Sequence, residues 1–215
     1  RQLDIEYATC KEILKLNDET ELVGRQISSR KENDIEALAV KAGVGKINCS
    51  SAAQLIIDQF RPDFIIDAGV SGSLTNTLKI YDIVCAEYSY EYDSCTGKTL
   101  GKIPPEDDKS CAVISKPSYQ KVLQEFSHHI HKTMGITIRV GNIACGEKDV
   151  KDRNLRKILQ DNFNALACDW ETSAVLRTAQ LNRVKSFSFR VISDLADENM
   201  KFDFTKNCKP APVSY

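Results

Sequence analysis

The sequence predicts a single-domain α/β protein with a mixed, largely parallel sheet flanked by helices. Its 215 residues fit one domain. Apolar runs of strand length alternate with segments of helical periodicity. No repeat, low-complexity tract or long linker divides residues 1–215. Strands separated by helices of this length usually pair in parallel and carry helices on both faces.

The first third of the chain predicts a helix, a hairpin and a second helix. Residues 4–16 carry apolar side chains at helical spacing. Residues 22–28 and 35–41 should pair across the polar tip 30–34, and residues 46–60 should form the next helix.

A short β-rich run at 63–68 lies between Pro62 and Gly69, so the residues after it, including Val70, Ser71 and Gly72, are expected to form a loop. In sheets of this class, ligands bind beyond the carboxyl ends of the strands. The remaining predicted elements are strands at 82–92, 111–115, 136–144, 165–169 and 187–193 and helices at 117–133, 149–162 and 171–180.

Composition excludes several classes of function. The net charge of −1 provides no basic surface for nucleic acid. No apolar stretch approaches the roughly 18 residues that span a bilayer, and residues 1–9 lack the pattern of a signal peptide. The eight cysteines are scattered without a C-x-x-C pair, which favours reduced thiols. We therefore expect a cytoplasmic protein that binds neither nucleic acid nor membrane.

Two motifs that could indicate a cofactor or metal do not meet the requirements. The turn at 43–46 (GVGK) has Val40 where a Walker motif needs glycine and Ile47 where it needs serine or threonine, so a tight turn before a helix is expected. As a dinucleotide-binding fingerprint it has Asn48 at the third glycine position. The histidines at 128, 129 and 131 lack partners at ligand spacing and predict a solvated helix face. Neither a metal nor a cofactor is expected.

Two acidic residues follow the last two predicted strands. Glu171 follows the strand at 165–169, and Asp194 directly follows the strand at 187–193. A carboxylate where a buried strand reaches the crevice is costly to desolvate, so it should be paired, hydrogen-bonded or functional. Capping of a following helix is the structural alternative.

The chain contains an ordered set of short segments: AGVGK at 42–46, RPD at 61–63, the glycine segment at 69–74, DIV at 82–84, the residues around Gly146, DWE at 169–171 and VISDLAD at 191–197. This set resembles the methylthioadenosine/S-adenosylhomocysteine nucleosidases, over roughly residues 3–204. The resemblance implies a nucleoside phosphorylase-like fold and cleavage of a purine nucleoside, and it favours functional roles for Glu171 and Asp194.

The resemblance implies a role for each matching residue. Asp194 would be the general acid at purine N7, oriented by Ser193, and Glu171 would bind the ribose hydroxyls. Glu6 would activate the water with the help of Arg190. The backbone at Val150 would contact the adenine edge, Phe204 or Phe202 would cover the purine, and Val70, Ser71 and Gly72 would line the site.

Several positions depart from the family. Asp149 stands where a purine-stacking phenylalanine is expected, and Trp170 replaces a ribose-packing methionine. Asp149 could accept from the exocyclic amine of adenine, but capping of a helix that starts there is favoured. The first strand of the family should precede Glu6, and Lys209 to Pro212 should resist a closing helix, so we expect a chain incomplete at both ends.

The expected activity is hydrolysis of an adenine nucleoside with an apolar 5′ group, because the carboxylates around Arg190 would repel a 5′-phosphate. A homodimer is implied, with the loop at 92–106 near the neighbouring active site. A purine nucleoside phosphorylase is the alternative enzyme, with Arg25 and Arg30 as candidate phosphate ligands. A nucleoside-binding protein without catalysis is the other alternative.

Overall fold

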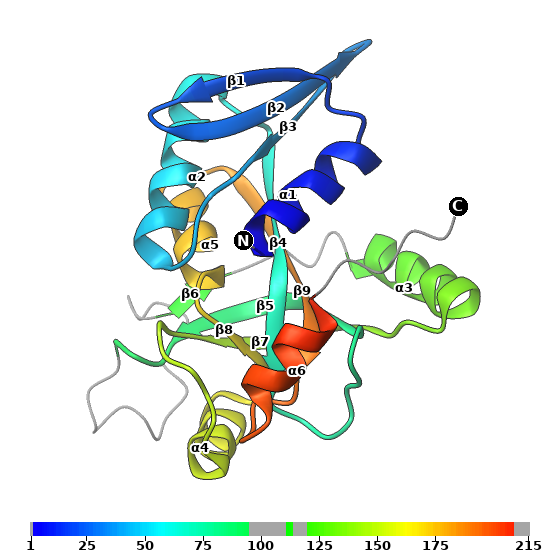
Figure 1. Cartoon of the computed structure of the whole chain (residues 1–215), viewed down its shortest axis with the longest axis vertical. Helices are drawn as coiled ribbons and strands as arrows, with labels where there is room; N and C mark the ends of the chain where they lie inside the picture. Colours follow the sequence, from blue (N-terminus) through cyan, green and yellow to red (C-terminus); the bar gives the residue numbers. More distant parts are fainter. Residues whose placement is uncertain (1, 95–110, 114–119, 209–215) are drawn as a thin grey trace.

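The structure is a computed structural model that describes residues 2–94, 111–113 and 120–208. Helices surround a central sheet, and a second, small sheet lies at one end of the molecule (Figure 1). The helices are α1 Gln2–Ile13, α2 Lys46–Phe60, α3 Gln120–Met134, α4 Arg153–Phe163, α5 Thr172–Leu181 and α6 Met200–Asn207. The strands are β1 Asp18–Leu22, β2 Arg25–Glu32, β3 Ile35–Val40, β4 Phe64–Ser73, β5 Ile83–Glu91, β6 Cys111–Val113, β7 Ile138–Cys145, β8 Ala165–Asp169 and β9 Lys185–Asp194.

The central sheet has the order β6-β5-β7-β8-β4-β9 and closes on itself because β5 also pairs with β9. The long pairings β4–β9 and β5–β7, and the pairing β7–β8, are parallel, while β4–β8, β5–β6 and β5–β9 are short and antiparallel. This confirms the predicted mixed, largely parallel sheet. Its closure was not predicted.

Apolar packing fixes the sheet to its helices. Val84, Ile143 and Ile192 form one fully buried cluster with Leu176 of α5. Cys49 and Ala53 of α2 pack against Ala174 and Val175 of α5, and the two helices run side by side in Figure 1. The start of each of these helices is thereby held near the ends of β4 and β8.

The small sheet contains the predicted hairpin. β2 and β3 pair antiparallel from Ile27–Val40 to Glu32–Ile35, so the turn is tighter than predicted. An additional strand, β1, pairs with β2 through a turn in which Val23 and Gly24 both have positive φ. Because valine rarely adopts that conformation, the sequence did not indicate this turn.

The predicted loop after residue 68 is wrong. Val70, Ser71 and Gly72 continue β4 and pair with β9, with a register shift between Ser71 and Gly72. Gly69 lies within this strand. The position favours glycine because the guanidinium of Arg190 lies against its backbone, where a Cβ would collide with Nη1. A glycine inside a strand can mark such a close approach rather than the strand end.

The helix predicted from residue 149 begins four residues later. Asp152 is the N-cap of α4, with extended backbone and a side chain that accepts from Asn154 N at 2.9 Å. Asp149 lies outside the helix and pairs with Lys151 at 2.7 Å, so it does not cap α4.

The bounds of α2 and β8 match the prediction, whereas α6 was not predicted. The three histidines of α3 are exposed, as expected. The described cysteines, Cys10, Cys49, Cys85, Cys145, Cys168 and Cys208, are free. Within the described ranges no helix is long and apolar enough to cross a membrane. The predicted start of α3 at Pro117 and the segment at 209–212 lie outside the described residues.

Candidate active site

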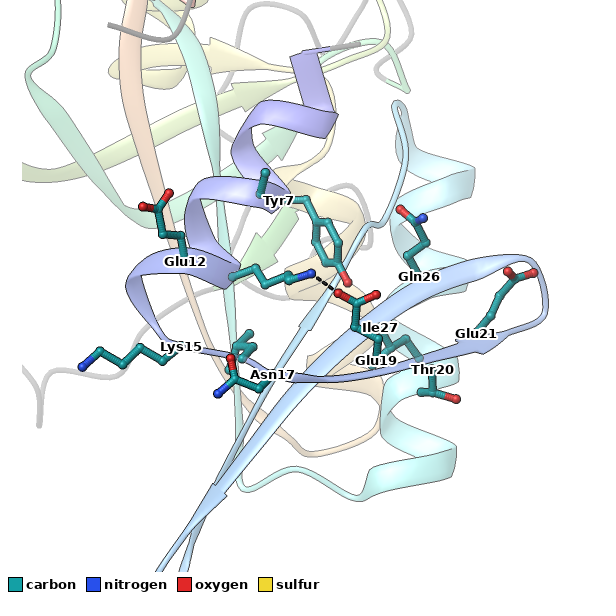
Figure 2. A pocket seen from close by; sticks show the side chains of 12 residues that line it. Tyr7, Glu12, Lys15, Asn17, Glu19, Thr20, Glu21, Gln26 and Ile27 are labelled. Carbon is teal, nitrogen blue, oxygen red and sulfur yellow. Dashed lines mark hydrogen bonds and ion pairs between the residues drawn. The ribbon is translucent and has the colours of Figure 1, made fainter. Parts of the chain in front are cut away.

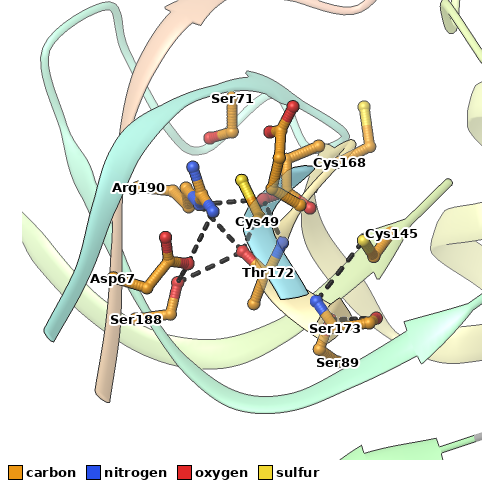
Figure 3. Close-up of polar contacts among 12 residues, drawn as sticks. Cys49, Asp67, Ser71, Ser89, Cys145, Cys168, Thr172, Ser173, Ser188 and Arg190 are labelled. Carbon is orange, nitrogen blue, oxygen red and sulfur yellow. Dashed lines mark hydrogen bonds and ion pairs between the residues drawn. The ribbon is translucent and has the colours of Figure 1, made fainter. Parts of the chain in front are cut away.

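Arg190, on β9, is the centre of a buried polar cluster that includes Asp67 of β4 and Asp169 at the end of β8 (Figure 3). Only 3% of its surface is exposed. Its Nη2 donates to Asp67 Oδ2 at 2.5 Å, and its Nε lies 2.8 Å from both Asp169 Oδ2 and Thr172 Oγ1. Burial lowers the pKa of Arg190, but the charges of Asp169 and Asp67 outweigh burial, so this pKa lies above its usual value. The guanidinium therefore remains charged.

Glu6 and Glu171 interact with the same arginine. Burial raises the pKa of Glu6, the charge of Arg190 lowers it, and the charge of Asp67 raises it. Burial and then the charge of Asp169 raise the pKa of Glu171, while Arg190 and the N–H of Gly45 lower it. The fold thus brings Glu6, which lies within helix α1, and Glu171 close enough to Arg190 for its charge to act on both.

The N-terminus of α2 holds the carboxylate of Glu171. Gly45 N donates to Glu171 Oε1 at 3.0 Å, and the neighbouring Lys46 N donates to Glu147 Oε1. Gly45 has a φ of 87°, and a Cβ there would collide with Glu147. The predicted turn at 43–46 therefore feeds α2 and supplies donors to an anionic side chain.

Asp194 forms a second group, at the end of β9. It is 4% exposed, and its Oδ2 and Oδ1 accept from Ser193 Oγ and Ala196 N, both at 2.9 Å. Burial is the largest cause of its raised pKa, which these two hydrogen bonds lower and the charges of Asp203 and Asp197 raise. A buried carboxyl group without a neighbouring cation among these causes is suited to retain a proton.

The end of β4 packs against Asp194. The Oγ of Ser193 also lies 3.2 Å from the carbonyl of Ser71, and a Cβ at Gly72 would be 2.8 Å from Asp194 Oδ1. The hydroxyl of Ser71 is buried without a partner among the described residues. Ser71 and Gly72 are therefore next to Asp194.

The remaining residues predicted to contact the ligand differ in how deeply they are buried. Val150 is buried in an apolar cluster with Leu159 and Phe163, which leaves its backbone as the group that could meet a ligand. Asp149 is exposed, Trp170 and Phe204 are half-buried, and Phe202 is exposed. Among the residues that the structure describes, no hydrogen bond or ion pair joins these side chains to Arg190 or Asp194.

The large cavity of the molecule lies elsewhere. Its volume is about 760 Å³, and it lies between α1 and the strands β1 and β2 (Figure 2). Tyr7, Lys11 and Glu19 are among its lining residues, and none of the predicted site residues is. The candidate site lies at the carboxylates near the strand ends, because the polar groups that converge there match the predicted chemistry, whereas this cavity is lined by charges of both signs.

Sequence reasoning missed Asp67, Thr172 and Ser188 and gave no role to Asp169. The sequence offers one sign of such a residue, a charge within an apolar run: Asp67 lies in the segment FIIDAG. Arg25 and Arg30, the candidate phosphate ligands, are engaged elsewhere: Arg25 donates to the carbonyl of Ala42, and Arg30 pairs with Glu32 at 2.7 Å.

Comparisons with known proteins agree with the fold. A 5′-methylthioadenosine/S-adenosylhomocysteine nucleosidase of Staphylococcus aureus is 29% identical over 187 residues, covering 84% of this chain and 78% of that protein. The crystal structure of a mutant Helicobacter pylori nucleosidase with 5′-methylthioadenosine in its active site has a TM-score of 0.83 at 21% identity, covering 96% and 87% of the two chains. The futalosine hydrolase of Helicobacter pylori also shares the fold, with a TM-score of 0.81 at 21% identity and coverage of 97% and 87%.

The family comparison covers nearly the whole chain. Residues 11–211 match the phosphorylase superfamily. This range includes Asp67, Glu171, Arg190 and Asp194, and so all of the site except Glu6. The fold, the carboxylates at the strand ends and this match agree: the chain belongs to the phosphorylase superfamily.

Proposed function

We propose that the protein hydrolyses the N-glycosidic bond of an adenine nucleoside such as 5′-methylthioadenosine or S-adenosylhomocysteine and releases adenine. The observation that carries this proposal is the position of Asp194, a buried carboxyl group with a raised pKa at the end of β9. The nucleosidases that resemble this chain in sequence and fold support it.

The leaving base needs a proton, and Asp194 is placed to give it. As the bond between C1′ and N9 breaks, its electrons move into the purine and Asp194 transfers its proton to N7. Ser193 holds Oδ2 of Asp194, and Ala196 N holds Oδ1, so the carboxyl group keeps its orientation. The hydrogen bonds also stabilise the carboxylate that forms.

The ribosyl group acquires positive charge, and a water molecule must add to C1′. Glu171, held by Gly45 N, is the fixed anion that binds the ribose hydroxyls and stabilises this charge. Glu6 accepts the proton of the attacking water, and the nearby charge of Arg190 favours the ionised form of Glu6 that this step needs. The products are adenine and the free sugar.

Release of free base from a panel of substrates tests the proposal: methylthioadenosine, S-adenosylhomocysteine, adenosine, inosine and adenosine monophosphate, each with and without phosphate. We expect methylthioadenosine to be preferred, since the carboxylates around Arg190 repel a 5′-phosphate. Dependence on phosphate would identify a phosphorylase. Purine binding without base release over hours would identify a binding protein.

A homodimer in the cytoplasm is the second part of the proposal. Ile47 of α2 and Leu181 of α5 are 80% and 78% exposed and line the same hollow of about 210 Å³. Adjacent exposed apolar side chains are typical of contact surfaces. The loop expected to reach the neighbouring site lies mostly outside the described residues. Sedimentation at micromolar concentration tests the dimer, and a fully active monomer would exclude it.

A further inference from the structure

Asp67 is a charged residue in the middle of an apolar strand. Its side chain on β4 is 11% exposed, between Ile66 and Ala68. Burial of a carboxylate is costly unless it is paired and hydrogen-bonded. Its Oδ2 accepts from Arg190 Nη2 at 2.5 Å and from Ser188 Oγ at 2.8 Å (Figure 3). The carboxylate is thus part of the same network as Arg190.

Arg190 is held at different nitrogens by different strands. Asp67 on β4 holds Nη2, and Asp169 at the end of β8 holds Nε. The third nitrogen, Nη1, lies against the backbone of Gly69. Because the guanidinium is planar, two ion pairs at separate nitrogens fix both its position and its rotation.

We propose that Asp67 is a positioning residue of this site, which holds the guanidinium of Arg190 from the side of β4 while Asp169 holds it from the side of β8. The inference rests on the proposed function, because Arg190 would help to place Glu6 and the attacking water. Without Asp67, the guanidinium would be held at Nε alone and could rotate about that contact.

The buried guanidinium of Arg190 needs two carboxylates because its Nε and Nη2 are separate donors. A single ion pair at Nε leaves Nη2 without an acceptor in a buried environment, which is unfavourable for a charged group. Ser188 and Thr172 add neutral hydroxyls, and their oxygens are 3.1 Å apart, so they connect the two carboxylate contacts. Asp67 is not among the predicted ligand contacts, so its replacement leaves those residues in place.

The test compares Asp67→Ser, which removes the contact, with Asp67→Asn, which keeps an oxygen acceptor for Nη2. We expect kcat of Asp67→Ser to fall by about ten- to hundredfold, as misplacement of a catalytic group does, with KM within about threefold of wild type. Asp67→Asn should recover most of this loss. A kcat for Asp67→Ser within threefold of wild type would overturn the proposal, and so would equal losses in the two variants.

Asp63→Ser is the matched control, since Asp63 is an exposed aspartate just before β4. We expect its kcat to stay near wild type. If Asp67→Ser does not fold, Asp67→Glu replaces it: the charge is retained but the carboxylate is displaced, and kcat should still fall. Unchanged kcat in Asp67→Glu would overturn the positioning role.

A second measurement does not depend on catalysis. Nuclear magnetic resonance of the side-chain Nη protons of Arg190, assigned with Arg190→Lys, reports how strongly rotation is restricted. We expect restricted rotation in wild type and Asp63→Ser and free rotation in Asp67→Ser. If the wild-type protein releases no adenine, the proposed function fails, and the rotation still decides whether Asp67 holds Arg190. Equal restriction in all three proteins would contradict the inference.

Discussion

Asp194 and Glu6 are both carboxylic acids whose pKa values burial raises, but their surroundings differ in one respect. Glu6 faces the cation Arg190, which lowers its pKa again. Asp194 is surrounded by Ser193, the N–H of Ala196 and further carboxylates, and no cation is among the causes of its shift. The charge of Arg190 therefore favours the ionised form of Glu6, whereas no cation opposes the effect of burial at Asp194.

The same contrast separates two positions on β9. Arg190 and Asp194 are four residues apart on this strand, and Ser193 between them has no partner on β4 because the register shifts there. Arg190 is enclosed by Asp67, Asp169 and Thr172, whereas Asp194 packs against the end of β4. Replacing charges one at a time tests whether these two environments have different roles.

The largest effect is expected for Asp194→Asn. The leaving base loses its acid, so base release should fall by about a hundred- to ten-thousandfold, in line with the usual contribution of general acid catalysis. Nucleoside binding, measured by calorimetry, should remain, because an amide keeps most of the contacts. Base release within about threefold of wild type would show that Asp194 is not the acid.

Glu171→Gln should have the next largest effect, a loss of about a hundredfold or more in kcat, since a fixed charge that stabilises the transition state is removed. Glu147→Gln is the matched control, because Glu147 accepts from the neighbouring N–H at the same helix N-terminus and is exposed. If both variants retain full activity, the carboxylate of Glu171 only serves as an acceptor at the start of α2.

Asp67→Asn should shift the pH profile of kcat/KM. The negative charge of Asp67 raises the pKa of Glu6, so its removal lowers that pKa. As a base, Glu6 must be ionised, so the acidic limb of the profile should move to lower pH. The other charged or titratable groups of this cluster are unchanged in the variant: Arg190, Asp169, Glu171 and Cys49. A shift to higher pH would show that Asp67 affects Glu6 mainly through Arg190.

The smallest effect concerns stability. The folded-state pKa of Asp194 is raised, so the stability contributed by its protonated form is fully present below the unfolded-state pKa and is lost as pH rises through the folded-state pKa. Asp194→Asn carries no such charge, so it should melt above wild type at pH 8, with about 2–4 °C for each kcal/mol gained. The difference should vanish at low pH. A lower melting temperature at pH 8 would mean that the hydrogen bonds of the carboxylate outweigh its desolvation.

The sequence indicated the elements whose signals are local. Helix α2 has apolar residues at helical spacing after a glycine turn, and β8 is a short apolar run, so the bounds of both were predictable. Asp194 and Glu171 stood out because each follows an apolar run. The resemblance to known nucleosidases assigned roles to these acids and to Glu6 and Arg190.

Only the tertiary structure decided which groups surround each carboxylate. The loop predicted at 69–73 is a strand because β9 pairs with it, and Asp149 does not cap a helix because Asp152 does. Asp67 and Arg190 are 123 residues apart in the chain, so no local pattern predicts their contact. The sequence by itself determined where chemistry could occur, since burial and residue type follow local patterns, whereas the pKa of each acid depends on charges that only the folded chain brings together.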